Sequence, residues 1–96
     1  MPAKALARAK EVRDDGSIVE IVIWELDGPV PPCAHPFKYR LYYGLAGRCR
    51  VRYDNERGKG DHKHVLEMEH GYAFIDVDTL VADFLADVER IRNEGD

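Results

Sequence analysis

The chain has 96 residues, of which 45% are hydrophobic and 33% charged, and its formal net charge is -4. A chain of this length builds one modest hydrophobic core, so we expect a single domain over residues 1–96. No apolar run approaches the roughly 20 residues that a membrane helix needs, and the N-terminus lacks the apolar segment of a signal peptide. The two cysteines, Cys33 and Cys49, are too few for a disulfide scaffold and are expected as free thiols. These features predict a cytoplasmic protein and exclude a membrane protein.

The charges are distributed unevenly along the chain. Counting Lys and Arg against Asp and Glu, residues 1–35 sum to -2, residues 36–65 to +5 and residues 66–96 to -7. The net charge argues against a nucleic-acid partner, but the local potential decides whether a surface attracts phosphate. The basic middle of the chain is therefore a candidate anion-binding region.

The first third of the chain predicts a β-hairpin followed by a loop. Residues 5–13 suit a strand or a short helical turn, DDG at 14–16 is typical of a turn, and residues 17–26 are rich in Ile and Val. Residues 27–36 contain four prolines, which cannot pair in the interior of a sheet. This last segment is therefore expected to be a connection.

Two segments in the middle of the chain, 37–43 and 48–54, alternate between apolar and polar side chains and flank the turn sequence GLAG at 44–47. Side chains of a strand point alternately to the two faces of a sheet, so this pattern predicts two antiparallel strands joined as a hairpin. The side chains expected on the core side are Phe37, Tyr39, Leu41, Tyr43, Cys49, Val51 and Tyr53.

The last third predicts one helix near residues 78–93. Its apolar residues recur at helical spacing, Asp78 is a suitable N-cap, and Gly95 follows near the end. The apolar stripe of this helix needs a sheet face to cover. The expected architecture is therefore an α+β domain, an antiparallel β-sheet meander of four to five strands covered by one C-terminal helix.

The outward side chains of the central hairpin are mostly basic and include one tyrosine. Cations that neutralise phosphates beside an aromatic ring that can stack on a base are typical of single-stranded nucleic-acid binding. The alternative is a solvated sheet face whose cations pair with the acidic helix or with a partner. The residues of this basic surface are Lys38, Arg40, Tyr42, Arg48, Arg50 and Arg52.

The segment HKHVLEM at 62–68 predicts one more strand, with His62, His64 and Leu66 on one face. Two histidines at this spacing suit a divalent metal ion, or they suit proton transfer in the attack of an RNA 2′-hydroxyl on its phosphate. A third interpretation is a pair of exposed histidines without a role. The carboxylates available as a further metal ligand are Asp54 and Asp61.

The preceding loop is almost entirely polar. Gly58 and Gly60 would let backbone N–H groups approach a ligand closely, and Arg57 and Lys59 could hold a phosphate. The P-loop pattern is missing, so this is not a nucleotide-binding loop of that class. A plain turn explains the glycines but leaves the clustered cations without a reason.

Three runs, HPFKYRLYYG, YDNERGKGDHKH and YAFIDVDTLVADFLADVERIR, give the chain a resemblance to the TumE family over about residues 18–92. TumE proteins are small bacterial toxins of toxin–antitoxin pairs. The resemblance therefore implies a cytosolic toxin that a cognate antitoxin neutralises. The positions that match the family's signature are Tyr53, Asp54, Asn55, Gly58, His62 and His64.

The resemblance and the residue pattern together predict a toxin that acts as a metal-independent endoribonuclease. In this interpretation His62 and His64 transfer protons, Asp54 orients an imidazole, and Arg57 and Lys59 stabilise charge on the phosphate. Two alternatives stay open: a non-catalytic module that binds nucleic acid or antitoxin, and a metal-dependent nuclease that uses the HxH pair. The expected partners are RNA and the antitoxin, without a cofactor, and a homodimer is left open. The residues expected to bind nucleic acid are Lys38, Arg40, Tyr42, Arg48, Arg50, Arg52, Tyr53, Asn55 and Lys63.

Overall fold

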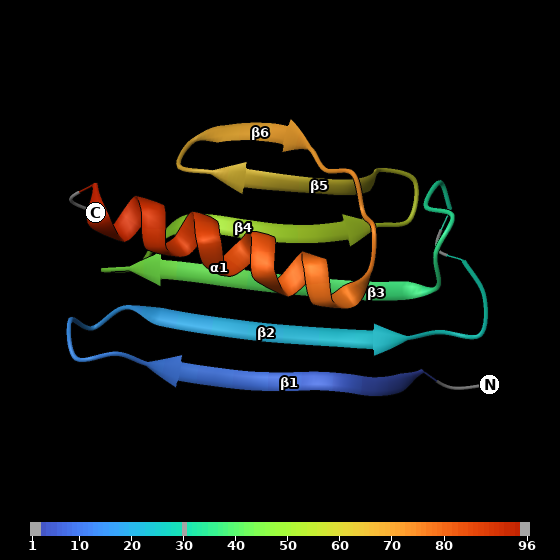
Figure 1. Ribbon diagram of the computed structural model, residues 1–96, viewed down its shortest axis with the longest axis horizontal. Helices are drawn as coiled ribbons and strands as arrows, with labels where there is room; N and C mark the ends of the chain where they lie inside the picture. The colour runs from blue at the N-terminus through green and yellow to red at the C-terminus, as the bar shows by residue number, and fades with distance from the viewer. Residues whose placement is uncertain (1–2, 30, 95–96) are drawn as a thin grey trace.

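The computed structural model describes residues 3–29 and 31–94, which form six strands and one helix (Figure 1). The strands pair in chain order as one antiparallel sheet, and α1 lies across β3 and β4 on one face. This confirms the expected α+β meander with a C-terminal helix, with six strands in place of four or five. The elements are β1 (Lys4–Val12), β2 (Ile18–Glu25), β3 (Phe37–Leu45), β4 (Arg48–Glu56), β5 (Gly60–Val65), β6 (Met68–Gly71) and α1 (Val77–Asn93).

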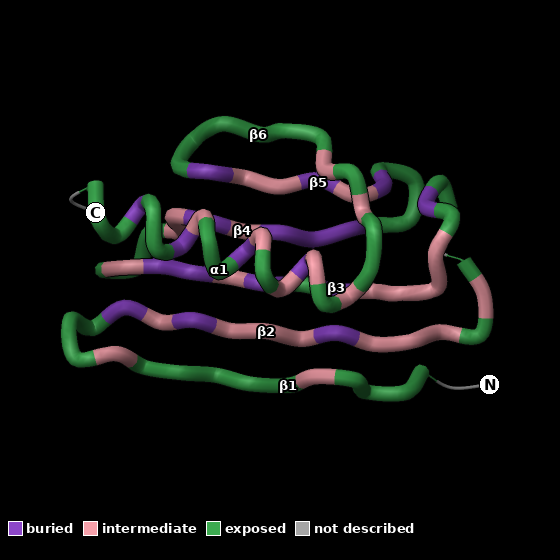
Figure 2. The backbone as a smooth tube through the Cα atoms, in the orientation of Figure 1, coloured by how far each residue is buried: buried purple, intermediate pink, exposed green. Residues whose placement is uncertain are grey.

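The core lies between α1 and the middle of the sheet, whereas β1 is exposed along most of its length (Figure 2). We call the sheet surface under α1 the helix face and the opposite surface the outer face. Burial of apolar side chains on the helix face is the main stabilising contribution, because removing apolar surface from water yields roughly 25 cal/mol per Å². The fully covered residues of this core include Tyr39, Leu41, Tyr43, Val51, Tyr53, Leu80, Phe84 and Val88.

A polar anchor also ties the helix to the sheet. The hydroxyl of Tyr53 donates to the carboxylate of Asp87, and Lys63 Nζ lies 3.1 Å from Asp87 Oδ2. Burial disfavours the charged form of Asp87, but hydrogen bonds from Tyr53, Lys63 and Arg90 outweigh it and hold the pKa of this carboxyl below its ordinary value. These contacts fix the position of α1 relative to β4 and β5.

The expected strand at 62–68 is in fact two strands. The chain reverses at Leu66 and Glu67, between the paired residues Val65 and Met68. Leu66 has a φ of 58°, a conformation that is uncommon for a bulky residue, and the turn contains no glycine or proline that would have revealed it. Leu66 therefore does not continue the face that carries the two histidines.

The helix begins slightly earlier than expected. Asp76, and not Asp78, is the N-cap: its Oδ1 accepts a hydrogen bond of 2.7 Å from the backbone N–H of Thr79. Asp78 lies in the first turn, where a negative charge interacts favourably with the helix dipole. Gly95, expected near the helix end, lies outside the described residues.

A β-bulge changes which side chains of β4 face outward. Tyr43 pairs with Val51, but Gly44 pairs with Cys49, so Arg50 is an extra residue on β4. The alternation shifts by one at this point, which places Cys49 on the outer face with Gly44 and Arg48 on the side of Leu45 and Tyr43. The expected inward orientation of Cys49 is therefore wrong, and the expected single row of Arg48, Arg50 and Arg52 is interrupted.

If the covering of the sheet by α1 holds the fold together, Leu80→Ala should lower the free energy of unfolding by about 2–5 kcal/mol, as for other buried leucines. Leu80 is fully buried, whereas Leu85 on the same helix is 38% exposed. Leu85→Ala is the matched control and should cost about 1 kcal/mol or less. Urea unfolding followed by circular dichroism measures both. Equal losses in the two variants would contradict the packing described here.

Candidate functional site

The pairing of β4 with β5 brings the polar residues of the outer face together. Arg52 is opposite His64, and Asp54 is opposite His62. Because opposite residues of an antiparallel pair lie on the same face, these four side chains form one group. We call them the outer cluster. The carboxylate and histidines that the sequence singled out are therefore neighbours in space.

His62 is the most enclosed member of the outer cluster. Its Nε2 lies 2.6 Å from Asp54 Oδ1, at an angle that does not meet hydrogen-bond geometry, and its Nδ1 lies 3.1 Å from the carbonyl oxygen of Gly60. Only 6% of the His62 side chain is exposed. Both ring nitrogens thus lie close to acceptor oxygens of the protein. Asp54 thus lies where it can orient this imidazole.

His64 is the accessible histidine, with 26% of its side chain exposed. Its ring meets that of His62 edge-on, with 5.6 Å between centroids, and its Nε2 lies 3.8 Å from Glu69 Oε2. Lys59 Nζ lies 3.5 Å from the same oxygen. The charge of Lys59 outweighs desolvation and, with a smaller contribution from His64, holds the pKa of Glu69 below its ordinary value.

The outer cluster includes the cation Arg52 and is bordered by Arg40 and Tyr42. Arg52 Nε lies 3.2 Å from Asp54 Oδ2, and the guanidinium of Arg40 lies over the ring of Tyr42, 5.2 Å from its centroid. The ring of Tyr42 lies over Gly44, where a Cβ would come within 2.1 Å of the tyrosine oxygen, so a side chain at position 44 would displace this ring. Of the predicted basic surface, the register thus keeps Lys38, Arg40, Tyr42 and Arg52 on the outer face; Arg48 lies on the opposite side, and Arg50 is the extra residue of the β-bulge.

Three residues expected to bind nucleic acid lie on the helix face instead. Tyr53 is 1% exposed beneath α1, which contradicts the expectation that it turns outward to stack on a base. Asn55 is fully buried, and Lys63 is paired with Asp87 of the helix. Asp61 also points to the helix face, so Asp54 alone of the two expected carboxylates accompanies His62 and His64. Arg57 lies exposed in the turn between β4 and β5.

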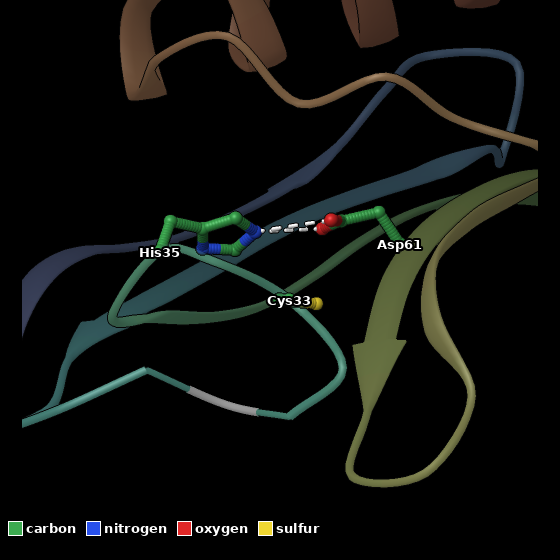
Figure 3. A group of neighbouring side chains, drawn as sticks. All are labelled: Cys33, His35 and Asp61. Atoms are coloured by element: carbon green, nitrogen blue, oxygen red, sulfur yellow. Dashed lines mark hydrogen bonds and ion pairs between the residues drawn. The ribbon is translucent and has the colours of Figure 1, made fainter.

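The helix face carries a second group of reactive side chains that sequence reasoning did not connect (Figure 3). Cys33 and His35 come from the connection between β2 and β3, and Asp61 comes from β5. His35 Nε2 lies 2.9 Å from Asp61 Oδ1, which also accepts a hydrogen bond of 2.6 Å from the Tyr39 hydroxyl. The CxH spacing in PCAHP was the available signal, but the four prolines around it favoured a plain connection.

This second group opens into a cavity of about 740 Å³ between the connection and the start of α1. The ring of His35 stacks on that of Phe74, with 3.8 Å between centroids. Burial, together with the nearby Asp61 carboxylate, raises the pKa of both the Cys33 thiol and the Tyr39 hydroxyl. Cys33 is thus held as a neutral thiol, which is a poor nucleophile.

Three groups among the described residues could hold a metal ion, because their ligand atoms lie within 4.8 Å of one another. Two belong to the outer face and share His62, and the third is the group on the helix face. The groups are His62, His64 and Glu69; Asp54, Glu56 and His62; and Cys33, His35 and Asp61. Nothing helical in residues 3–29 and 31–94 combines the length and apolar character that a membrane crossing requires.

Comparisons with known proteins agree with the sequence resemblance. The family model described as Toxin TumE matches residues 2–92, nearly the whole chain. No curated protein and no solved structure gives a match. The chain therefore belongs to the TumE toxin family, which makes it a toxin of the toxin–antitoxin type with an antitoxin as its partner.

Proposed function

We propose that this toxin acts by cleaving RNA at the outer cluster, without a metal ion, as an endoribonuclease. The observation that carries the proposal is the close group of Asp54, His62 and His64 beside the cations Arg52 and Arg40. Cleavage of RNA at a 2′-hydroxyl needs a base, an acid and positive charge around one phosphate. These are the groups that the outer face presents together.

The cations of the outer face are suited to hold the RNA backbone. Arg40 and Arg52 lie on adjacent strands, and each guanidinium offers a planar set of donors that matches phosphate oxygens. Tyr42 lies beside them and is partly exposed, so a base can stack near the arginines. Lys59, at the opposite border of the cluster, adds charge near His64 through their shared contact Glu69.

The two histidines take different roles because they differ in access. We assign His64, the exposed ring, to accept the proton of the 2′-hydroxyl as its oxygen attacks phosphorus. We assign His62 to return a proton to the departing 5′-oxygen. Because its ring nitrogens face Asp54 and Gly60 in the free protein, this step requires the ring to turn its Nε2–H from Asp54 toward the phosphate when RNA binds. The products are a 2′,3′-cyclic phosphate and a free 5′-hydroxyl, and the enzyme ends with the proton moved from one histidine to the other.

The cavity on the helix face is less suited to RNA. Its lining includes Asp61, Asp76 and Asp78, and none of the described residues around it is Lys or Arg. Such a lining repels phosphate, because like charges that approach in a cleft of low dielectric cost free energy. RNA is therefore expected on the outer face alone.

The basic surface can be tested with charge reversal. Arg40→Glu combined with Arg52→Glu should abolish RNA retention at physiological salt. At low salt, where residual binding can be measured, each lost phosphate contact should reduce the magnitude of the negative slope of log affinity against log salt by about 0.7. Arg48→Glu is the control, since the β-bulge removes this exposed arginine from the outer face. Filter binding over a salt series measures both. An unchanged slope in the double variant would show that the outer face does not bind phosphates.

The histidines can be tested by single and double replacement. His64→Ala and His62→Ala should each reduce the cleavage rate by about 10²–10⁴-fold, and the double variant should lose little more, because the two act as one unit. The rate should be bell-shaped in pH. His70→Ala, which removes an exposed histidine of β6, is the control and should keep full activity. Full activity in the double variant would leave the outer cluster without a catalytic role.

A metal-dependent nuclease is the alternative that His62, His64 and Glu69 favour, since their ligand atoms lie close together. Chelation with EDTA separates the two mechanisms. Activity that vanishes in EDTA and returns with Mn²⁺ or Mg²⁺ would move the outer cluster to the metal mechanism.

Toxicity can be tested in cells. Expression of the chain should slow growth, and co-expression of the antitoxin encoded beside it should restore growth. Expression of His64→Ala at the same level should leave growth unchanged, because the variant lacks the proposed base; circular dichroism of the purified variant verifies that the fold is retained. Growth arrest that persists with His64→Ala would indicate that toxicity arises from binding and not from cleavage.

A further inference from the structure

The group on the helix face has the chemistry of a metal site. Cys33, His35 and Asp61 each offer one ligand atom, and the three atoms lie within 4.8 Å of one another (Figure 3). All three side chains are largely enclosed, with Cys33 8% exposed and the side chains of His35 and Asp61 each 13% exposed. They come together only because the connection before β3 folds against the start of β5.

We propose that Cys33, His35 and Asp61 bind a zinc-class divalent metal ion, with the fourth coordination position open to the adjoining cavity. Thiolate, imidazole and carboxylate are the donors that Zn²⁺ accepts, and three protein ligands with one open position are typical of zinc sites that also bind water or a substrate. The cavity of about 740 Å³ that adjoins the three residues leaves room for such a fourth ligand.

Neighbouring side chains are placed to orient the ligands. The Tyr39 hydroxyl donates to Asp61 Oδ1 at 2.6 Å, and Asn55 Nδ2 lies 3.8 Å from Cys33 Sγ, within the range of a hydrogen bond to sulfur. Outer contacts of this kind fix the direction of a ligand atom and are a regular feature of metal sites. Both Tyr39 and Asn55 are fully buried, so their positions are set by the core.

Metal binding changes the protonation of Cys33 and the tautomer of His35. The Cys33 thiol loses its proton to solvent and coordinates as a thiolate. The backbone N–H of Phe37 donates to His35 Nδ1 at 3.2 Å, so the proton of the neutral ring is on Nε2, which faces Asp61. Metal binding at Nε2 moves this proton to Nδ1 and gives up the Phe37 contact.

The surrounding charge favours a cation here over the outer face. The carboxylates of Asp76 and Asp78 line the same cavity as Asp61, and none of the described residues around the cavity is Lys or Arg. On the outer face, Lys59 Nζ lies 3.5 Å from Glu69 and Arg52 Nε lies 3.2 Å from Asp54, so cations already compete for the carboxylates there. A thiolate also binds zinc-class metals more strongly than an oxygen ligand.

The test uses the purified full chain and Co²⁺ as the spectroscopic probe, followed by competition with Zn²⁺. Co²⁺ should bind with one equivalent and show the sulfur-to-metal charge-transfer band of thiolate ligation together with tetrahedral absorption. Cys33→Ser should abolish the charge-transfer band. Cys49→Ser, which removes the thiol of the outer face, is the matched control and should leave the spectrum unchanged.

The remaining ligands have matched controls too. His35→Ala and Asp61→Asn should weaken Zn²⁺ binding by more than about 100-fold, and Tyr39→Phe by about 10–100-fold, the usual effect of removing an outer contact. His70→Ala and His64→Ala should bind Zn²⁺ as the parent does. Circular dichroism of each apo variant verifies that the fold is retained.

Some outcomes would overturn the proposal. They are the absence of a charge-transfer band in the parent, its survival in Cys33→Ser, or its loss in His64→Ala with Cys33 intact. This inference does not depend on RNA cleavage, since Cys33→Ser leaves the outer cluster unaltered. An EDTA effect on cleavage that persists in Cys33→Ser belongs to the outer cluster, and one that disappears belongs to the helix face.

Discussion

The side chain of Asn55 takes the place of backbone hydrogen bonds where β3 and β4 part. The ladder between these strands ends with Arg40 opposite Asp54. Beyond it, Asn55 Oδ1 accepts from the N–H of Tyr39 at 3.0 Å, and Asn55 Nδ2 donates to the carbonyl of Phe37 at 2.7 Å. A buried amide that lost these partners would carry the full cost of desolvation, so few other side chains are tolerated here. The entry of β3 into the sheet depends on this contact.

Each candidate site contains a residue that is next to Asn55 in the sequence or in contact with its side chain. Asp54, one residue before Asn55, faces outward to His62, whereas Asn55 faces the helix side and approaches the sulfur of Cys33. On β5 the same alternation sends Asp61 to the helix face and His62 to the outer face. The period of two along a strand thus divides the polar residues of segment 54–62 between two chemically different surfaces. On the outer face, cations lie beside the carboxylates. Around the cavity on the helix face, none of the described lining residues is Lys or Arg.

The proline-rich connection is a structural part of this arrangement. The N–H of Gly58 donates to the carbonyl of Pro31 at 2.9 Å, and a Cβ at Gly60 would lie 3.2 Å from the ring of Pro32. Gly58 and Gly60 both have positive φ, so the turn between β4 and β5 needs glycine for its backbone as well as for this contact. The turn and the connection therefore hold each other, and Cys33 and His35 are carried to Asp61 as a result.

The sequence by itself determined the class of fold, the central hairpin and the C-terminal helix, and it placed His62 and His64 on one strand face, because hydrophobic periodicity and strand alternation are local properties. It left open whether Asp54 or Asp61 accompanies the two histidines. It could not reveal the reversal at Leu66, which has no glycine or proline, or the bulge at Arg50, because Gly44 opposite the bulge was equally suited to the expected turn GLAG. It also could not join Cys33 and His35 to Asp61, which lies more than 20 residues away along the chain. Only the tertiary structure decided which face each polar residue occupies, because a one-residue shift in register moves a side chain to the opposite side of the sheet.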